Sequence, residues 1–225
     1  MGEKVKPHLN SFILYVVFLF LVIIGIVFLF SKNTASEEKQ TSERAATNSG
    51  KLNMGTYKNP PKMEITPNKQ YRAVMETSKG SLKIELFAKE TPQTVNNFAF
   101  LAKNGYYDKT RFHRIVKDFM IQTGDPQGDG TGGPGYTFPD EKITRDYTRG
   151  IVAMANRGPD TNGSQFFIIH KDTNLPKNYV IFGIVTEGMD VVDKIAQTPT
   201  VDNGFGEKSK PTEDITVEKI SIQEK

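Results

Sequence analysis

Apolar and polar residues alternate with a period of two in the segments that follow Tyr71. Residues 71–76 and residues 82–86 each place an apolar side chain at every second position. The sequence SKGS at 78–81 lies between them and is typical of a turn. This pattern predicts an antiparallel β-hairpin with one apolar face.

Two other segments have helical spacing. Thr91 is a candidate N-cap, Pro92 suits the first helical position, and Asn104-Gly105 ends the pattern. Between them the apolar positions i, i+3, i+4 and i+7 are Val95, Phe98, Ala99 and Ala102. A second helix near the C-terminus is predicted by Met189, Val192, Ile195 and Ala196.

Short apolar runs account for the rest of the regular pattern. They predict further strands at 112–121, 151–155, 166–169, 180–185 and 215–222. Many short strands with turns and only two helices favour an antiparallel barrel or a sandwich.

Residues 12–30, FILYVVFLFLVIIGIVFLF, carry no charge. At 1.5 Å per residue a helix of this length spans about 28 Å, close to the hydrocarbon core of a bilayer. A cleaved signal peptide is the alternative, but its apolar region is usually shorter and SKNTASEE is a poor cleavage site. We therefore predict a transmembrane anchor at 12–30, preceded by a cytoplasmic N-terminus at 1–11.

The lysines before the predicted anchor indicate its orientation in the membrane. Lys4 and Lys6 precede the span, so the positive-inside rule puts the N-terminus in the cytoplasm and the rest of the chain outside. Residues 31–68 are rich in Ser, Thr, Asn, Lys and Glu and predict a flexible linker, with 69–225 as the folded domain. We expect a single-pass protein of the cell membrane with an extracytoplasmic domain.

Composition narrows the chemistry of the domain. The 225-residue chain has no Cys, and its His residues, His8, His113 and His170, have no zinc-ligand spacing. The formal net charge is +3, but Lys and Arg balance Asp and Glu from Lys69 onward. Neither a nucleic-acid partner nor a metal or other cofactor is expected.

Three long motifs occur in a fixed order in this domain. They are FHRIVKDFMIQTGDP at 112–126, GTGGPGYTFPDE at 130–141 and MANRGPDTNGSQFFI at 154–168. In order and spacing they resemble the cyclophilin-type peptidyl-prolyl cis-trans isomerases, from about Tyr71 to the C-terminus. The resemblance implies a mainly β fold, a closed eight-stranded antiparallel barrel capped by two helices.

The resemblance also implies an activity and a site. Arg114 would be the catalytic residue, with its guanidinium aimed at the prolyl nitrogen as the amide twists. The resemblance implies a proline pocket made by Phe119, Met120, Phe167 and Leu175. It implies further substrate contacts from Gln122, Gly130, Ala155, Asn156, Arg157, Gln165 and Tyr179.

Two positions depart from many relatives in this family. Asn174 stands where they have Trp before the pocket Leu, and Tyr179 stands where they have His. We therefore expect cyclosporin to bind weakly. Arg157 stands where a small residue is common and is expected to alter access to the site.

The sequence thus predicts a membrane-anchored isomerase that acts on proline-containing polypeptides and assists the folding of exported proteins. We expect it to be a monomer. The alternative is a non-catalytic cyclophilin-like module that binds Pro-containing segments at the cell surface. The set Arg114, Phe119, Met120, Gln122 and Phe167 favours the enzyme.

Overall fold

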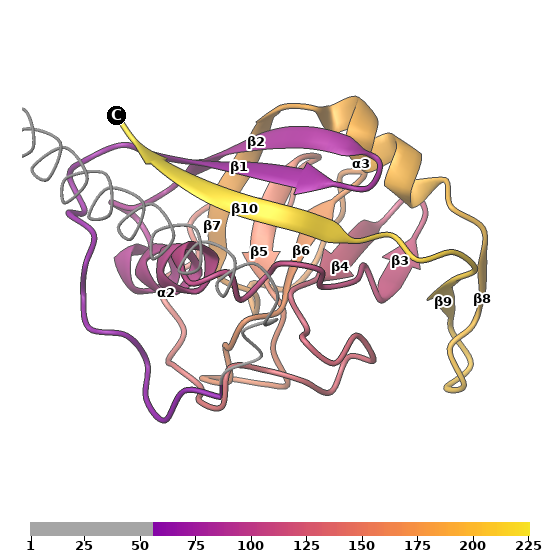
Figure 1. Cartoon of the computed structure of the whole chain (residues 1–225), viewed down its shortest axis with the longest axis horizontal. Coiled ribbons are helices and arrows are strands. Elements are labelled where there is room, and N and C mark those ends of the chain that lie inside the picture. Colours follow the sequence, from indigo (N-terminus) through magenta and orange to yellow (C-terminus); the bar gives the residue numbers. More distant parts are fainter. Residues whose placement is uncertain (1–55) are drawn as a thin grey trace, which may run out of the picture. The chain divides into compact units, whose positions relative to one another are not determined.

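The computed structural model describes residues 56–225. Its largest element is an antiparallel sheet with the strand order β10-β1-β2-β7-β5-β6-β4-β3, and β8 and β9 form a separate hairpin (Figure 1). The helices are α2 (Pro92–Lys103) and α3 (Met189–Ala196). The strands are β1 (Tyr71–Thr77), β2 (Gly80–Leu86), β3 (Arg114–Val116), β4 (Met120–Thr123), β5 (Ile151–Met154), β6 (Phe166–Ile169), β7 (Ile181–Glu187), β8 (Thr200–Asp202), β9 (Lys208–Pro211) and β10 (Val217–Glu224).

The sheet is a half-barrel, so the expectation of a closed barrel is wrong. Its two edges are β10 and β3, which do not pair. Strand β3 has three residues and ends in a turn where Asp118 has φ 62°, so it offers little edge for a second ladder. Instead the chain before β3 reaches β10, through a bridge between Arg111 and Thr216.

The predicted hairpin and both helices are confirmed. Strands β1 and β2 pair from Tyr71–Leu86 to Thr77–Gly80, and their apolar faces are buried. Helix α2 buries its predicted apolar face, including Phe98, whose ring packs edge-on against Phe166 at 5.4 Å. The predicted strand at 112–121 is divided into β3 and β4 by the turn at Asp118.

The N-terminus of α2 is capped by a residue distant in sequence. Thr91 occupies the N-cap position, but its hydroxyl donates to carbonyl oxygens and makes no cap hydrogen bond. The carboxylate of Glu141 accepts hydrogen bonds from the N–H of Gln93 at 2.9 Å and of Thr94 at 2.7 Å. An anion here satisfies free donors and complements the positive end of the helix dipole.

The segment before β1 has defined contacts with the domain. The N–H of Tyr57 donates to the Pro134 carbonyl at 2.7 Å, and the N–H of Glu64 donates to Asn96 Oδ1 at 2.7 Å. The last part of the predicted linker therefore lies along the domain. In residues 56–225 no helix is long and apolar enough to cross a membrane, and the predicted span at 12–30 lies outside these residues.

The cap predicts a stability effect. Glu141→Ala should lower the free energy of unfolding by about 1–2 kcal/mol, because it leaves two helix N–H groups without their acceptor. Urea denaturation of the domain measures this change. Lys142→Ala, an exposed change at the next residue, is the control. Equal stability of the two variants would show that water replaces the carboxylate without cost.

Candidate active site

The register of four strands brings the central site residues into one row. Arg114 on β3 is paired with Gln122 on β4, and Gln122 is paired with Phe167 on β6. Phe167 is in turn paired with Ala153 on β5. Directly paired residues of antiparallel strands point to the same face of a sheet. A guanidinium, an amide and an aromatic ring therefore emerge side by side.

The next row points to the opposite face and belongs to the main core. Ile115, Ile121, Ile168 and Val152 occupy it and are buried in the large cluster that also contains α2 and α3 side chains. The face that carries Arg114 has its own apolar cluster. This part of the sheet therefore has an apolar cluster on each face, and only the face that carries Arg114 borders the site.

The predicted proline pocket residues gather in this second cluster. Met120 and Phe167 are buried, while Phe119, Leu175 and Tyr179 are partly buried against them. The rings of Phe167 and Tyr179 meet edge-on at 5.5 Å. The structure thus brings together the four residues implied to form the proline pocket, with Tyr179 beside them.

Some of the predicted polar residues form a hydrogen-bond network next to the apolar cluster. Gln122 Nε2 donates to Gln165 Oε1 at 3.0 Å, and Gln165 Nε2 donates to the carbonyls of Gly130 and Gly132 at 3.0 and 2.8 Å. A cavity of about 360 Å³ opens beside this hydrogen-bond network. The predicted site residues that line it are Gln122, Gly130, Ala155, Asn156, Arg157 and Gln165.

Arg157 spans one side of that cavity. Its Nη2 donates to the carbonyls of Gly130 at 3.1 Å and Thr131 at 2.8 Å, so the side chain connects the loop after β5 with the loop after β4. Asn156 also lines the cavity, and its Nδ2 donates to the Asn178 carbonyl at 2.8 Å. Asn174 is exposed in the loop before Leu175, and weak cyclosporin binding remains a prediction.

Asp125 organises the glycine-rich wall of the cavity and was not among the predicted site residues. Its buried carboxylate accepts hydrogen bonds from the N–H groups of Gln127, Asp129 and Gly130 at 2.8, 3.2 and 2.6 Å. At Gly132 an added Cβ would lie 2.0 Å from Asp125 Oδ1, so a side chain is excluded there. Close packing around this carboxylate explains glycine at that position.

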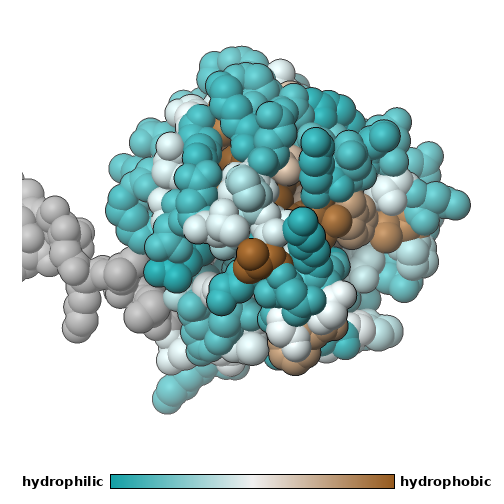
Figure 2. Space-filling view, turned by 90° about the vertical axis from the view of Figure 1, so that its right-hand side faces the viewer, coloured by the Kyte–Doolittle hydropathy of each residue, from teal (hydrophilic) through white to brown (hydrophobic). Residues whose placement is uncertain are grey.

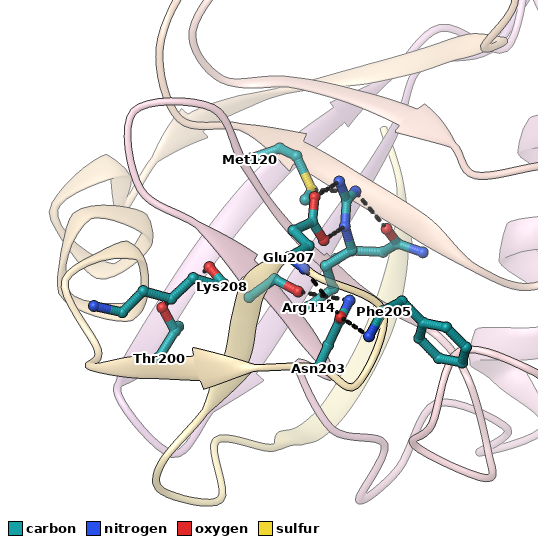
Figure 3. Close-up of polar contacts among 9 residues, drawn as sticks. Arg114, Met120, Thr200, Asn203, Phe205, Glu207 and Lys208 are labelled. Carbon is teal, nitrogen blue, oxygen red and sulfur yellow. Dashed lines mark hydrogen bonds and ion pairs between the residues drawn. The ribbon is translucent and has the colours of Figure 1, made fainter.

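Glu207 is the second residue that sequence reasoning missed. It lies immediately before β9, and its carboxylate accepts from Arg114 Nε at 2.7 Å and Nη2 at 2.6 Å (Figure 3). The guanidinium lowers the pKa of the Glu207 carboxyl by hydrogen bonding, although partial burial opposes that shift. The carboxylate is therefore charged at neutral pH and paired with Arg114.

The other edge of Arg114 has weaker partners. Nη1 donates to Gln122 Oε1 at 3.3 Å and to Met120 Sδ at 3.7 Å. The guanidinium carbon lies 5.9 Å from the centre of the Phe119 ring. A long hydrogen bond and a sulfur acceptor are readily exchanged for a better partner. Nη1 is thus directed toward the apolar cluster and open to exchange with an incoming group.

Comparison with known proteins agrees with this geometry. A family model described as "Cyclophilin type peptidyl-prolyl cis-trans isomerase/CLD" matches residues 72–222. A human protein named "Peptidyl-prolyl cis-trans isomerase-like 1" is 43% identical over 167 residues, which covers 70% of this chain and 93% of the relative. The Mycobacterium tuberculosis "Probable peptidyl-prolyl cis-trans isomerase B" is 39% identical over 170 residues, and the match covers 68% of this chain.

The mycobacterial relative is longer, since the match covers 54% of it and the chain spans about half its length. Among solved structures, a cyclophilin-type isomerase from Cryptosporidium parvum matches with a TM-score of 0.62 and 38% identity. That match covers 68% of this chain and 98% of the Cryptosporidium chain. From the family match, the sequence identities and the shared fold, the chain belongs to the cyclophilin-type peptidyl-prolyl cis-trans isomerases.

Proposed function

We propose that the domain catalyses rotation about X-Pro peptide bonds of polypeptide substrates. The observation that carries this proposal is the position of Arg114, a permanently charged group beside an apolar cluster, with Nη1 directed toward that cluster. The apolar cluster suits a proline ring, and the neighbouring amides suit the substrate backbone. A relative from Cryptosporidium parvum was solved in the presence of the dipeptide Ala-Pro.

The chemistry needs only a fixed donor. Rotation about a peptide bond has a barrier of about 18–20 kcal/mol because the C–N bond has partial double-bond character. When the amide twists, the lone pair of the prolyl nitrogen becomes available, and Nη1 of Arg114 can donate to it. Such a hydrogen bond is stronger in the transition state than in the ground state, which is the condition for raising the rate.

The remaining residues of the site bind the substrate. Phe119, Met120, Phe167 and Leu175 would hold the proline ring by burying apolar surface. Gln122 and Gln165 would meet the backbone polar groups of the substrate, because both already lie in the hydrogen-bonded chain along the cavity. No proton is transferred in this scheme, so no general base is needed.

We further propose that the isomerase is held at the outer face of a cell membrane by residues 12–30 and assists the folding of exported proteins. The support is the uncharged run of 12–30, with Lys4 and Lys6 before it. Prolyl isomerisation takes tens to hundreds of seconds unaided, so newly exported chains would benefit from a catalyst there.

The first test is Arg114→Ala. Loss of one transition-state hydrogen bond typically lowers kcat by about 10²–10³-fold, so the variant should lose most of its activity on a prolyl peptide. Arg111→Ala, an exposed arginine on the same segment, should keep the parent activity. If parent and Arg114→Ala are equally active, the mechanism is wrong. A folded parent that binds but does not isomerise Pro peptides would establish the non-catalytic binding module.

The second test separates binding from stability. Phe167→Ala should weaken binding of a Pro peptide and also cost about 3–5 kcal/mol of folding free energy, because Phe167 is buried. Phe119→Ala should weaken binding with a smaller loss of stability, since Phe119 is only partly buried. Peptide titration and urea denaturation of both variants measure the two effects. If both variants fold and bind the peptide with the affinity of the parent, the assignment of these residues to the proline pocket is wrong.

The third test concerns location. Protease added to intact cells should release a fragment of about the size of the domain by cutting between residues 31 and 56, while residues 1–30 stay with the membrane fraction. Immunoblots against a tag at each end of the chain follow both products. Two outcomes would contradict the proposed location. One is release of the whole chain into the medium without added protease. The other is a chain that protease cuts only after the cells are lysed.

A further inference from the structure

The β8–β9 hairpin lies beside β3 and has a well-defined turn (Figure 3). Asn203 Oδ1 accepts from the N–H groups of Phe205 at 2.9 Å and Glu207 at 3.3 Å. The N–H of Asn203 donates to the Glu207 carbonyl at 2.9 Å. Gly204 and Gly206 have φ 90° and 81°, values that favour glycine. The backbone of Glu207 is therefore held from both sides.

The hydrogen bonds that define this turn do not involve the carboxylate of Glu207. The hydrogen bonds to Asn203 use the backbone of Glu207, so its side chain is free to reach Arg114. The two side chains are 33% and 39% exposed, and an ion pair as exposed as this contributes little to stability. Figure 2 looks onto this side of the domain, and its surface is mainly hydrophilic with a few separate apolar spots. A gain in folding stability from the ion pair is therefore a weak explanation for this carboxylate.

The geometry of the pair indicates that use. Glu207 takes Nε and Nη2, the side of the guanidinium away from Gln122, with two short hydrogen bonds. Nη1 is left with the two weak partners described above. A carboxylate that blocked the reaction would compete for Nη1, the donor directed at the apolar cluster. Glu207 instead fixes the plane of the guanidinium and leaves that donor to the substrate.

We propose that Glu207 is a positioning residue for the isomerase reaction, which fixes the Arg114 guanidinium before the substrate arrives. This inference rests on the proposed catalytic role of Arg114. A free arginine side chain samples many rotamers, and a bidentate carboxylate removes that freedom in advance. Preorganised donors stabilise a transition state without reorganisation during the reaction.

The test compares Glu207→Gln and Glu207→Asp with the parent in the full chain. A displacement of about 1 Å at a catalytic group can cost on the order of 100-fold in rate, so partial loss of the hold should lower kcat about tenfold in Glu207→Gln. KM should change by less than about twofold, because the apolar cluster and the amides are untouched. Glu207→Asp keeps the charge and should recover part of kcat. Glu213→Gln, which removes an exposed carboxylate paired with Lys79, is the matched control.

A double-mutant cycle assigns the effect to Arg114. If Glu207 acts only through that side chain, Glu207→Gln should have no further effect on kcat in the Arg114→Ala background. The Arg114 Nε–H resonance in ¹⁵N-edited NMR gives a signal independent of activity. It should be sharp in the parent and in Glu213→Gln, and broadened by solvent exchange in Glu207→Gln.

The outcomes separate the two proposals. A parent-like kcat in Glu207→Gln, with Arg114→Ala inactive, would overturn the positioning role and leave the proposed function intact. A higher kcat in Glu207→Gln would also overturn it, since the carboxylate would then be a brake. Activity in Arg114→Ala equal to that of the parent would overturn the proposed mechanism and this inference with it. A tenfold loss that persists in the Arg114→Ala background would show that Glu207 acts by another route.

Discussion

The register of β3, β4 and β6 is the constraint on which the site depends. Because side chains alternate between the faces of a strand, a shift of one residue would move Arg114 into the main core and Ile115 out of it. The core side of this sheet is filled by large apolar residues that tolerate no such exchange. Core packing therefore fixes the position of the catalytic candidates, although none of them belongs to the main core.

An apolar second face creates a difficulty for a charged group. A guanidinium beside Phe119 and Met120 loses part of its hydration, which costs free energy unless other groups compensate. Glu207 supplies the opposite charge and two acceptors, and Gln122 supplies a third. Glu207 thus compensates the charge of the Arg114 guanidinium at Nε and Nη2, while Nη1 keeps only weak partners. A site that acts through a hydrogen bond from a cation needs both conditions.

The sequence predicted those parts of the molecule that depend on periodic apolar positions. The hairpin 71–86, the helix after Pro92 and the helix at 189–196 follow directly from spacing, because burial of one face determines both pattern and structure. The motif resemblance then supplied the site residues, and the structure brings the guanidinium, the amides and the apolar residues together. The failure of the barrel to close was not predictable, because it depends on how short β3 is before the turn at Asp118.

The residues that sequence reasoning missed are polar and are distant in sequence from their partners. Glu141 caps a helix that begins almost fifty positions earlier in the chain. Glu207 meets Arg114 across a separation of 93 residues. The β8–β9 hairpin was missed as well, since residues 200–211 have no regular apolar alternation. A single carboxylate in a polar segment gives no periodic signal, so its role becomes visible only when the fold brings its partner close.

The same kind of polar contact determines the shape of the binding region. Asp125 gathers the N–H groups of the loop after β4, and Gln165 binds the Gly130 and Gly132 carbonyls of that loop. Arg157 reaches the loop from the opposite side. Loops fixed by several such hydrogen bonds lose little further conformational freedom when a substrate binds, which lowers the entropic cost of binding. The sheet positions Arg114, and these buried and bridging polar groups position the walls of the neighbouring cavity. Backbone pairing and core packing fix the sheet, whereas side-chain hydrogen bonds to loop carbonyls fix the walls, and Gln122 belongs to both.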